Sequence, residues 1–390
     1  MAVVGGFAMS MIATLSSIYL IVDVGLGPLQ LVLVGSVLEG TVLLFEVPTG
    51  VVADSVSRRT SVLIGFALYG AGFLMYAVPT FAVVLVAQVV WGLGATFISG
   101  ANVAWLVDEI GEAKARPLFL RSSQLAQTAA FAGIAAGIGL GSIALGLPVA
   151  MGGIVYLGLG LWLVGAMVES ERPQGHATVR AAMGETLRSA RDTLHLRPVL
   201  LLVLAVAALH GASTEGFDRL WELQLLESVD LPEVGAFGIT VWFGLLRAVG
   251  LAVSIGATMF VRRRLRDKTS DAAVKALAIT ALLFAVAMGA YALATSLVAA
   301  VFAYWFLIAV RGVHTPLFTA WMNTGLASAS RATVNSAGSQ ADALGQVGGG
   351  PVLGWIAAAR SVRAAIGAAA LLALPVVPLV GRGRRAERTP

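Results

Sequence analysis

Twelve apolar stretches, each about as long as a membrane-spanning helix, account for most of this 390-residue sequence. A helix that crosses the roughly 30 Å hydrocarbon core of a bilayer needs about 20 residues. Cutting the sequence at polar residues, glycines and prolines places these stretches at residues 4–24, 29–52, 60–79, 81–107, 118–144, 148–168, 198–225, 235–261, 273–294, 297–322, 332–357 and 362–381. Hydrophobic residues make up 58% of the chain and charged residues only 12%, whereas soluble domains carry about 25% charged residues. We therefore expect an all-α membrane protein, which excludes a soluble enzyme, a nucleic-acid-binding module and a secreted scaffold.

The distribution of Lys and Arg predicts the orientation of the chain. If both termini are cytoplasmic, 21 of the 26 Lys and Arg residues lie in cytoplasmic loops or in the tail, as the positive-inside rule requires. This bias accounts for the net charge of +5 without a nucleic-acid partner. The N-terminus has neither the basic region nor the cleavage site of a signal peptide, so we expect a retained first helix. With no targeting extension, a multi-pass protein of a bacterial inner (plasma) membrane is expected.

The longest polar stretch, residues 169–197, falls between the sixth and seventh apolar stretches. It divides the chain into a six-helix bundle at 1–168, a cytoplasmic connector at 169–197, a second six-helix bundle at 198–381 and a basic cytoplasmic tail at 382–390. The fifth and eleventh stretches also carry corresponding breaks, namely Gly133, Gly137 and Gly141 in one and Gly350, Pro351 and Gly354 in the other. Such paired breaks indicate transporter repeats, although each glycine can equally serve close helix packing.

The end of the second stretch reads FEVPTGVVADSVSRRTSVLIG over residues 45–65. This segment resembles the signature of the major facilitator superfamily in that loop, G-x-x-x-D-R-x-G-R-R/K, at Gly50, Asp54, Arg58 and Arg59. Two positions depart from the signature, because Ser55 and Ser57 stand where the family usually has Arg and Gly. The resemblance covers the whole chain and implies twelve helices in two pseudo-symmetric six-helix bundles. It also implies secondary active transport by alternating access, without a cofactor and usually by a monomer.

The resemblance further implies a cytoplasmic latch. Asp54 would face the positive N-terminal end of the eleventh helix, near Arg331. Arg58 would pair with an acid at the cytoplasmic end of the fourth helix, where Asp108, Glu109 and Glu112 lie. The alternative is that Arg58 and Arg59 only set the topology.

Two further family patterns are altered in this sequence. The fourth stretch resembles the family's R-x-x-x-G-x-G segment, with Gln88 in place of the arginine. The Gly-Pro element that exporters carry in the fifth helix is replaced by glycines alone, and a Gly-Pro lies in the eleventh stretch instead. These departures weigh against the drug:proton antiporter subgroup and leave the resemblance to the superfamily intact.

Several ionisable residues fall inside the apolar stretches, where they are costly and indicate a functional site. Glu39 and Asp342 each lie about ten residues into a helix, which places them near the membrane midplane. Arg247 and Arg311 are central or slightly cytoplasmic. Together with Gln124, Trp242 and Trp305, these two arginines are candidates for lining a substrate cavity.

The seventh stretch is the most polar. Glu215, Asp218, Arg219 and Glu222 follow the spacing i, i+3, i+4 and i+7, which predicts one helical face. In one interpretation Glu215 and Arg219 form an ion pair and the other residues line an external vestibule. In the other, an acid here or elsewhere in the membrane takes up a proton, because a partly desolvated carboxylate can load and release a proton near neutral pH. The candidates for proton coupling are Glu39, ranked first, and Glu215, Asp218 and Asp342.

The embedded charges also bear on the substrate. Six acids (39, 46, 215, 218, 222 and 342) face three arginines (219, 247 and 311), which favours a cationic or zwitterionic substrate, or proton coupling, over a multiply anionic substrate. Aromatic residues such as Trp242 and Trp305 can offer a stacking wall. For Trp221 we favour the role of an anchor at the membrane interface.

The sequence lacks the motifs of other membrane machines. It has no G-x-x-x-x-G-K-[ST] nucleotide loop, no H-E-x-x-H and no paired metal-ligand spacing among its four histidines. It has no cysteine, which excludes disulfides and Cys-ligated metals. A nucleophile with a matching base is also missing. We therefore expect no enzyme, no metal site and no cofactor.

The leading hypothesis is a secondary active transporter that exports a small amphipathic organic compound or drug, cationic or zwitterionic, in exchange for protons, as in multidrug efflux. Na⁺ is the alternative coupling ion. The first alternative keeps the fold and changes the task to uptake by proton symport or to lipid flipping. The second alternative, from another class, is a receptor or scaffold that does not transport.

Overall fold

The computed structural model describes residues 1–169, 184, 199–229, 231–232, 238–265, 270–324 and 328–386. Every secondary-structure element within these residues is a helix. The first six helices are α1 (Ala2–Val22), α2 (Pro28–Ser55), α3 (Arg58–Tyr76), α4 (Phe81–Ile110), α5 (Glu112–Gly141) and α6 (Leu147–Ala166). The later helices are α8 (Val199–Ser228), α9 (Gly238–Leu265), α10 (Ser270–Leu293), α11 (Leu297–Met322), α12 (Ser328–Ala359), α13 (Val362–Ala373) and α14 (Val376–Ala386).

Each of the twelve predicted apolar stretches corresponds to helix, so the predicted all-α fold is confirmed. The last stretch, 362–381, consists of two consecutive helices, α13 and α14. Pro375 stands immediately before α14, and a proline breaks a helix because it lacks the N–H group and its ring collides with the preceding turn. Among the described residues, nine helical stretches are long and apolar enough to cross a membrane.

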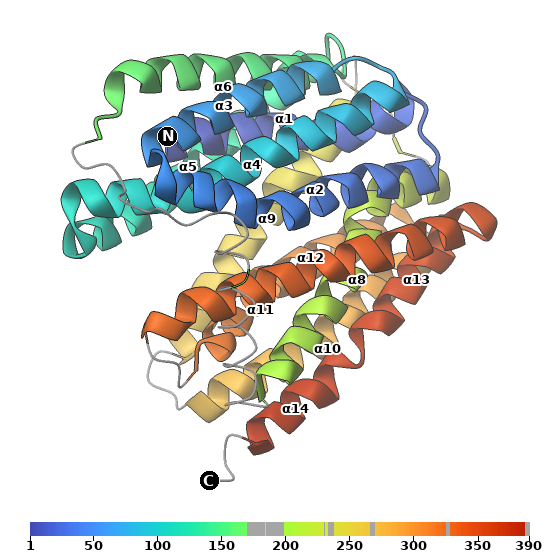
Figure 1. Ribbon diagram of the computed structural model, residues 1–390. Helices are drawn as coiled ribbons and strands as arrows, with labels where there is room; N and C mark the ends of the chain where they lie inside the picture. The colour runs from blue at the N-terminus through green and yellow to red at the C-terminus, as the bar shows by residue number, and fades with distance from the viewer. Residues whose placement is uncertain are drawn as a thin grey trace. The chain divides into compact units, whose positions relative to one another are not determined.

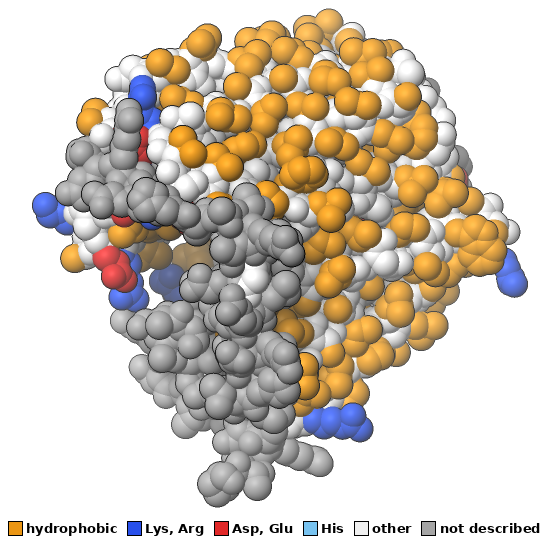
Figure 2. Space-filling model, in the orientation of Figure 1, with side chains coloured by type: hydrophobic (Ala, Val, Ile, Leu, Met, Phe, Trp, Pro, Cys, Tyr) orange, Lys and Arg blue, Asp and Glu red, His pale blue; other side chains and the backbone are white. Residues whose placement is uncertain are grey.

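The outer surface is apolar, as a lipid environment requires. On the face drawn in Figure 2, hydrophobic side chains cover most of the described surface and charged side chains lie at its edges. Large side chains that a soluble protein would bury are exposed, including Leu161 (75%), Leu293 (73%) and Trp355 (63%). Exposed apolar patches of this extent mark a surface that another apolar phase covers.

The chain forms two compact units. The first comprises residues 1–26, 37–185 and 233–244, and the second comprises 27–36, 186–232 and 245–390. The start of α2 therefore packs with the second unit and the start of α9 with the first. The predicted connector, 169–197, lies almost entirely outside the described residues, and the predicted tail, 382–390, is described only to residue 386, so the predicted domain boundaries stay a prediction.

In the first unit, α1 packs against α5, and α3 packs against α4 and α6 (Figure 1). The α1–α5 contact is close because glycines leave room for the neighbouring backbone. A methyl group on Gly133 would collide with the carbonyl oxygen of Phe7, and a methyl group on Gly137 would lie 2.8 Å from the carbonyl oxygen of Met11. These glycines therefore serve close helix packing, the alternative that the sequence left open.

In the second unit, α8 packs against α12, and α10 packs against α11 and α13. Small residues again set the distance between helices. Methyl groups on Gly211 and Gly345 of the α8–α12 contact would meet the backbones of Asp342 and Ala208. This close contact brings Asp342 to the polar part of α8.

Helix α11 contains Pro316, which cannot donate to the carbonyl oxygen of Gly312 one turn earlier. The hydroxyl of Thr258 on α9 lies 2.9 Å from that oxygen and 2.8 Å from the carbonyl oxygen of Ser254. A side chain of the neighbouring helix thus supplies a donor to the carbonyl that the proline leaves open.

Candidate functional site

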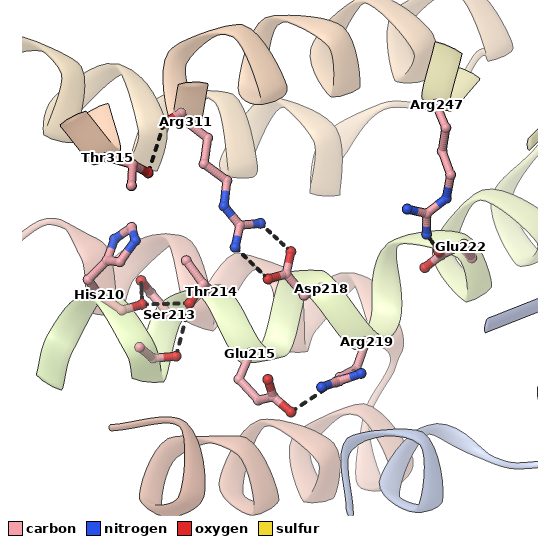
Figure 3. A network of polar contacts seen from close by, with 11 residues as sticks. His210, Ser213, Thr214, Glu215, Asp218, Arg219, Glu222, Arg247, Arg311 and Thr315 are labelled. Atoms are coloured by element: carbon pink, nitrogen blue, oxygen red, sulfur yellow. Dashed lines mark hydrogen bonds and ion pairs between the residues drawn. The ribbon is translucent and has the colours of Figure 1, made fainter. Parts of the chain in front are cut away.

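The polar part of α8 carries three ion pairs (Figure 3). Within α8, Arg219 Nε donates to Glu215 Oε1 at 3.0 Å. The guanidinium of Arg311, on α11, binds both carboxylate oxygens of Asp218, with the Nη2–Oδ2 bond at 2.7 Å. Arg247, on α9, donates to Glu222 Oε1 at 2.8 Å. Each of the three membrane-embedded arginines is therefore bonded to an acid of α8.

The four charged residues of α8 form two pairs that lie at the two edges of the predicted polar face. In Figure 3, Asp218 and Glu222 point toward the arginines from α11 and α9, whereas Glu215 and Arg219 point to the opposite side of the ribbon. On that side, Gly350 of α12 leaves room for Glu215, since a methyl group there would lie 3.1 Å from Glu215 Cγ. One edge of the polar face of α8 therefore contacts α9 and α11, and the other edge contacts α12.

The three pairs differ in exposure. The side chains of Glu215 and Glu222 are 2% and 1% exposed, while those of Asp218 and Arg311 are both 34% exposed. A buried carboxylate that loses its cation is strongly destabilising, so the Glu215–Arg219 pair stabilises α8 and the Glu222–Arg247 pair joins α8 to α9. The Asp218–Arg311 pair is the one whose two partners are both accessible.

Asp342 lies on α12, half-buried, and accepts a hydrogen bond of 2.8 Å from Gln346 one turn later. Arg311 interacts electrostatically with both Asp218 and Asp342. The structure thus brings together three of the predicted site residues, Asp218, Asp342 and Arg311.

The aromatic residues have structural contacts. Trp221 is 4% exposed, stacks on Tyr304 with ring centroids 4.3 Å apart, and lies 5.5 Å from the guanidinium carbon of Arg247. The predicted role of Trp221 as an interfacial anchor is therefore wrong, because the ring is buried beside an ion pair. Trp305 is half-buried, and its indole N–H donates to the carbonyl oxygen of Leu246 at 3.1 Å.

The remaining predicted cavity and coupling residues belong to the first unit. Glu39 is half-buried on α2, Trp242 is half-buried on α9, and Gln124 is exposed on α5. Both Glu39 and Trp242 have interaction partners.

A pair of stacked histidines, with His314 buried and His210 half-buried, was not predicted. The rings of His210 (α8) and His314 (α11) stack with centroids 5.2 Å apart, and His314 Nδ1 lies 3.1 Å from the hydroxyl of Thr280 on α10. The three residues come from three different helices. Because they lie far apart in the sequence, no local sequence pattern predicted their contact. Within the described residues, no three potential metal ligands come together.

At the other predicted site, Arg58 contacts Asp108, one of the three acids that the sequence analysis named. Arg58 Nη2 also lies 3.5 Å from Asp54 Oδ1, and the Asp54 side chain is 70% exposed. The side chain of Arg331, the predicted neighbour of Asp54, lies outside the described residues. Gly50 has open space around it.

Ser57, which departs from the family signature, is the N-cap residue of α3. Its hydroxyl accepts a hydrogen bond from Thr60 N at 2.9 Å, which is N-capping, and donates to Glu169 Oε2 at 2.7 Å. The other oxygen of Glu169 accepts from Arg59 N at 3.2 Å, and the Arg59 side chain donates to the carbonyl oxygen of Val164 at 2.6 Å. Glu169, which the sequence analysis placed in the connector, thus joins the start of α3 to the end of α6.

Replacing Ser57 by alanine should lower the free energy of unfolding by about 1 kcal/mol, because the helix loses its cap, and Glu169 also loses a donor. Thermal unfolding of the purified protein in detergent measures this loss. Ser123→Ala, at an exposed position on α5, is the matched control and should leave the unfolding temperature nearly unchanged. An unchanged unfolding temperature for Ser57→Ala would contradict the capping role.

Comparison with known proteins identifies the family. The model of the Major Facilitator Superfamily matches residues 1–350. The chain belongs to the major facilitator superfamily. The MFS-type transporter YxaM of Bacillus subtilis (strain 168) is 25% identical over 378 residues, which cover 95% of this chain and 92% of YxaM. The protein is therefore a multi-pass membrane transporter of this superfamily, as the loop signature predicted.

Solved structures of transporters share the superfamily fold. The nucleoside transporter NupG superposes with a TM-score of 0.76 at 12% identity, covering 100% of this chain and 98% of NupG. A peptide transporter POT in complex with sulfate superposes with a TM-score of 0.74 at 15% identity, covering 99% of this chain and 93% of the transporter. These likenesses establish the twelve-helix fold and leave the substrate of this member open.

Proposed function

We propose that this transporter exports a small cationic or zwitterionic amphipathic compound from the cytoplasm in exchange for protons. The observation that carries the proposal is the charge balance of the embedded groups. In the apolar stretches six acids (39, 46, 215, 218, 222 and 342) face three arginines (219, 247 and 311), and each of the three arginines is bonded to an acid of α8. A proton or a cationic group of a substrate neutralises such a surplus.

The coupling acids in this proposal are Glu39 and Asp342, which lie near the midplane by residue count. Glu215 is bonded to Arg219 and is assigned a structural role. Asp342 accepts from an uncharged amide and is near Arg311, so protonation of Asp342 changes the charge beside the accessible Asp218–Arg311 pair. Proton uptake and substrate binding are coupled through that arginine.

In the same proposal, the contact between Arg58 and Asp108 is a latch that breaks and forms again as residues 1–168 rock against residues 198–381. Both termini are cytoplasmic, and the membrane is the bacterial inner membrane. Gly50, Asp54 and Arg59 complete the latch loop. The substrate cavity includes Arg311, Arg247 and the aromatic ring of Trp305.

The test is transport by the purified protein in liposomes with an imposed pH gradient. A panel of labelled cationic and zwitterionic amphiphiles is loaded inside, and movement of each compound is followed with the gradient in either direction. We expect at least one compound to move against its concentration gradient when protons flow the opposite way. Movement with the proton flow would establish uptake by symport instead.

Movement driven by a Na⁺ gradient alone would replace the proton by sodium. Lipid and anion panels provide the remaining comparison. If a fluorescent phospholipid crossed the bilayer faster with the protein than without it, flipping would replace export. If no compound of any panel moved with correctly folded protein, the proposal would be wrong and a receptor or scaffold would take its place.

A further inference from the structure

A small groove lies between α9 and α11, apart from the ion pairs of α8. Its volume is about 260 Å³. The apolar walls are Val261 and Leu265 from α9 and Val313, Pro316 and Leu317 from α11, and Arg262 lies at its charged end. Both helices are among those long and apolar enough to cross a membrane, so the groove opens on apolar surface.

The groove lies beside the hydrogen bond that joins α9 to α11. Thr258 and the Gly312 carbonyl oxygen hold the two helices together at 2.9 Å. One turn further along α11, Pro316 has an exposed ring. The groove is therefore built into the contact between the helices.

The charged end of the groove is strongly basic. Arg262, Arg263 and Arg264 form the last turn of α9 and are all exposed. Arg262 lines the groove, whereas the guanidinium carbon of Arg264 lies 5.2 Å from the ring of Phe260. Such a run at the end of a membrane helix belongs on the cytoplasmic side, where basic pockets between helices bind anionic lipid headgroups.

We propose that this groove binds one anionic phospholipid, with the headgroup phosphate at Arg262 and an acyl chain along Val261, Val313 and Leu317. The apolar walls suit an acyl chain, and the arginine suits a phosphate. A second copy of the protein is a poorer occupant, because symmetric docking would bring two arginine runs together and like charges in contact are unfavourable. The lipid site is independent of the direction, substrate and coupling ion of transport.

Native mass spectrometry of the full-length protein released from detergent tests the proposal. Phosphatidylglycerol and phosphatidylcholine with identical oleoyl chains are titrated separately, and the lipid-bound fraction is measured. We expect one phosphatidylglycerol to be retained at concentrations where phosphatidylcholine is lost. Arg262→Gln should weaken phosphatidylglycerol binding about fivefold, the effect of one basic residue near an anionic headgroup.

Arg264→Gln is the matched control, because it removes the same charge from the same helical turn without touching the groove. It should keep at least half of the binding. Val261→Trp, which fills the groove and leaves every arginine in place, should abolish the specific retention. The unfolding temperature of each variant shows that it is folded.

Three outcomes would overturn the proposal. Equal retention of the two lipids means that the headgroup charge is not recognised. Equal losses for Arg262→Gln and Arg264→Gln mean that the basic run attracts lipid without the groove. A dimer signal that Val261→Trp removes, with no bound lipid, means that a second copy occupies the groove.

Discussion

Replacing Arg219 by glutamine is expected to lower the free energy of unfolding by about 3 kcal/mol. Removing one partner of a buried pair costs roughly 3–5 kcal/mol because the remaining charge is left uncompensated. Glu215 is 2% exposed and Arg219 is 27% exposed, so we expect the lower end of that range. Gly35 and Gly350 lie against Glu215. Because glycine has no side chain, neither residue can donate a hydrogen bond from a side chain to Glu215 in place of Arg219. Thermal unfolding in detergent measures the effect.

Two variants make the result specific. Glu215→Gln should cost less than Arg219→Gln, because a partly exposed arginine is solvated more easily than a buried carboxylate. The double variant should be more stable than Arg219→Gln alone, since it leaves no buried charge. Arg363→Gln, at an exposed position on α13, should change the stability by less than about 0.5 kcal/mol. If Arg219→Gln unfolded at the wild-type temperature, Glu215 would not depend on this arginine.

Replacing Asp342 by asparagine is expected to abolish transport driven by a pH gradient. The change keeps the shape of the side chain and its contact with Gln346, and it removes the group to which the proposed mechanism assigns proton uptake. Exchange of labelled for unlabelled substrate needs no net proton movement and should persist. Uptake into liposomes, measured with and without the gradient, separates the two activities.

Asp23→Asn is the matched control for this experiment, because Asp23 is an exposed residue in the turn after α1. It should transport like the wild type. Glu39→Gln tests the other candidate acid in the same assay. Persistence of gradient-driven transport in Asp342→Asn together with its loss in Glu39→Gln would move the coupling role to α2. Persistence in both variants would refute proton coupling through either acid.

Local spacing predicted part of the site and packing decided the rest. The Glu215–Arg219 pair follows from the i, i+4 spacing on one helix, and it forms as expected. The partners of Asp218 and Glu222 are 93 and 25 residues away. Which arginine meets which acid depends on how α9 and α11 are rotated against α8, and a single sequence does not encode that rotation in any local pattern.

The fold itself was more accessible to prediction because hydrophobic length is a local property. The twelve stretches and the loop signature led to the superfamily, which the family comparison confirms. Trp221 shows the limit of such reasoning, since a tryptophan at the end of an apolar stretch also fits a buried stacking position. The hydrogen bond from Ser57 to Glu169 was missed because the two residues lie 112 positions apart in the sequence.

The hydrogen bond from Thr258 to Gly312 has a mechanical consequence. A proline leaves a point of easy bending in a helix, and in α11 that point lies next to Arg311. Because the freed carbonyl is held by α9, bending α11 there stretches a bond to α9 unless both helices bend. Arg311 and Arg247 are therefore carried on helices that are tied to each other at the point where α11 bends most easily.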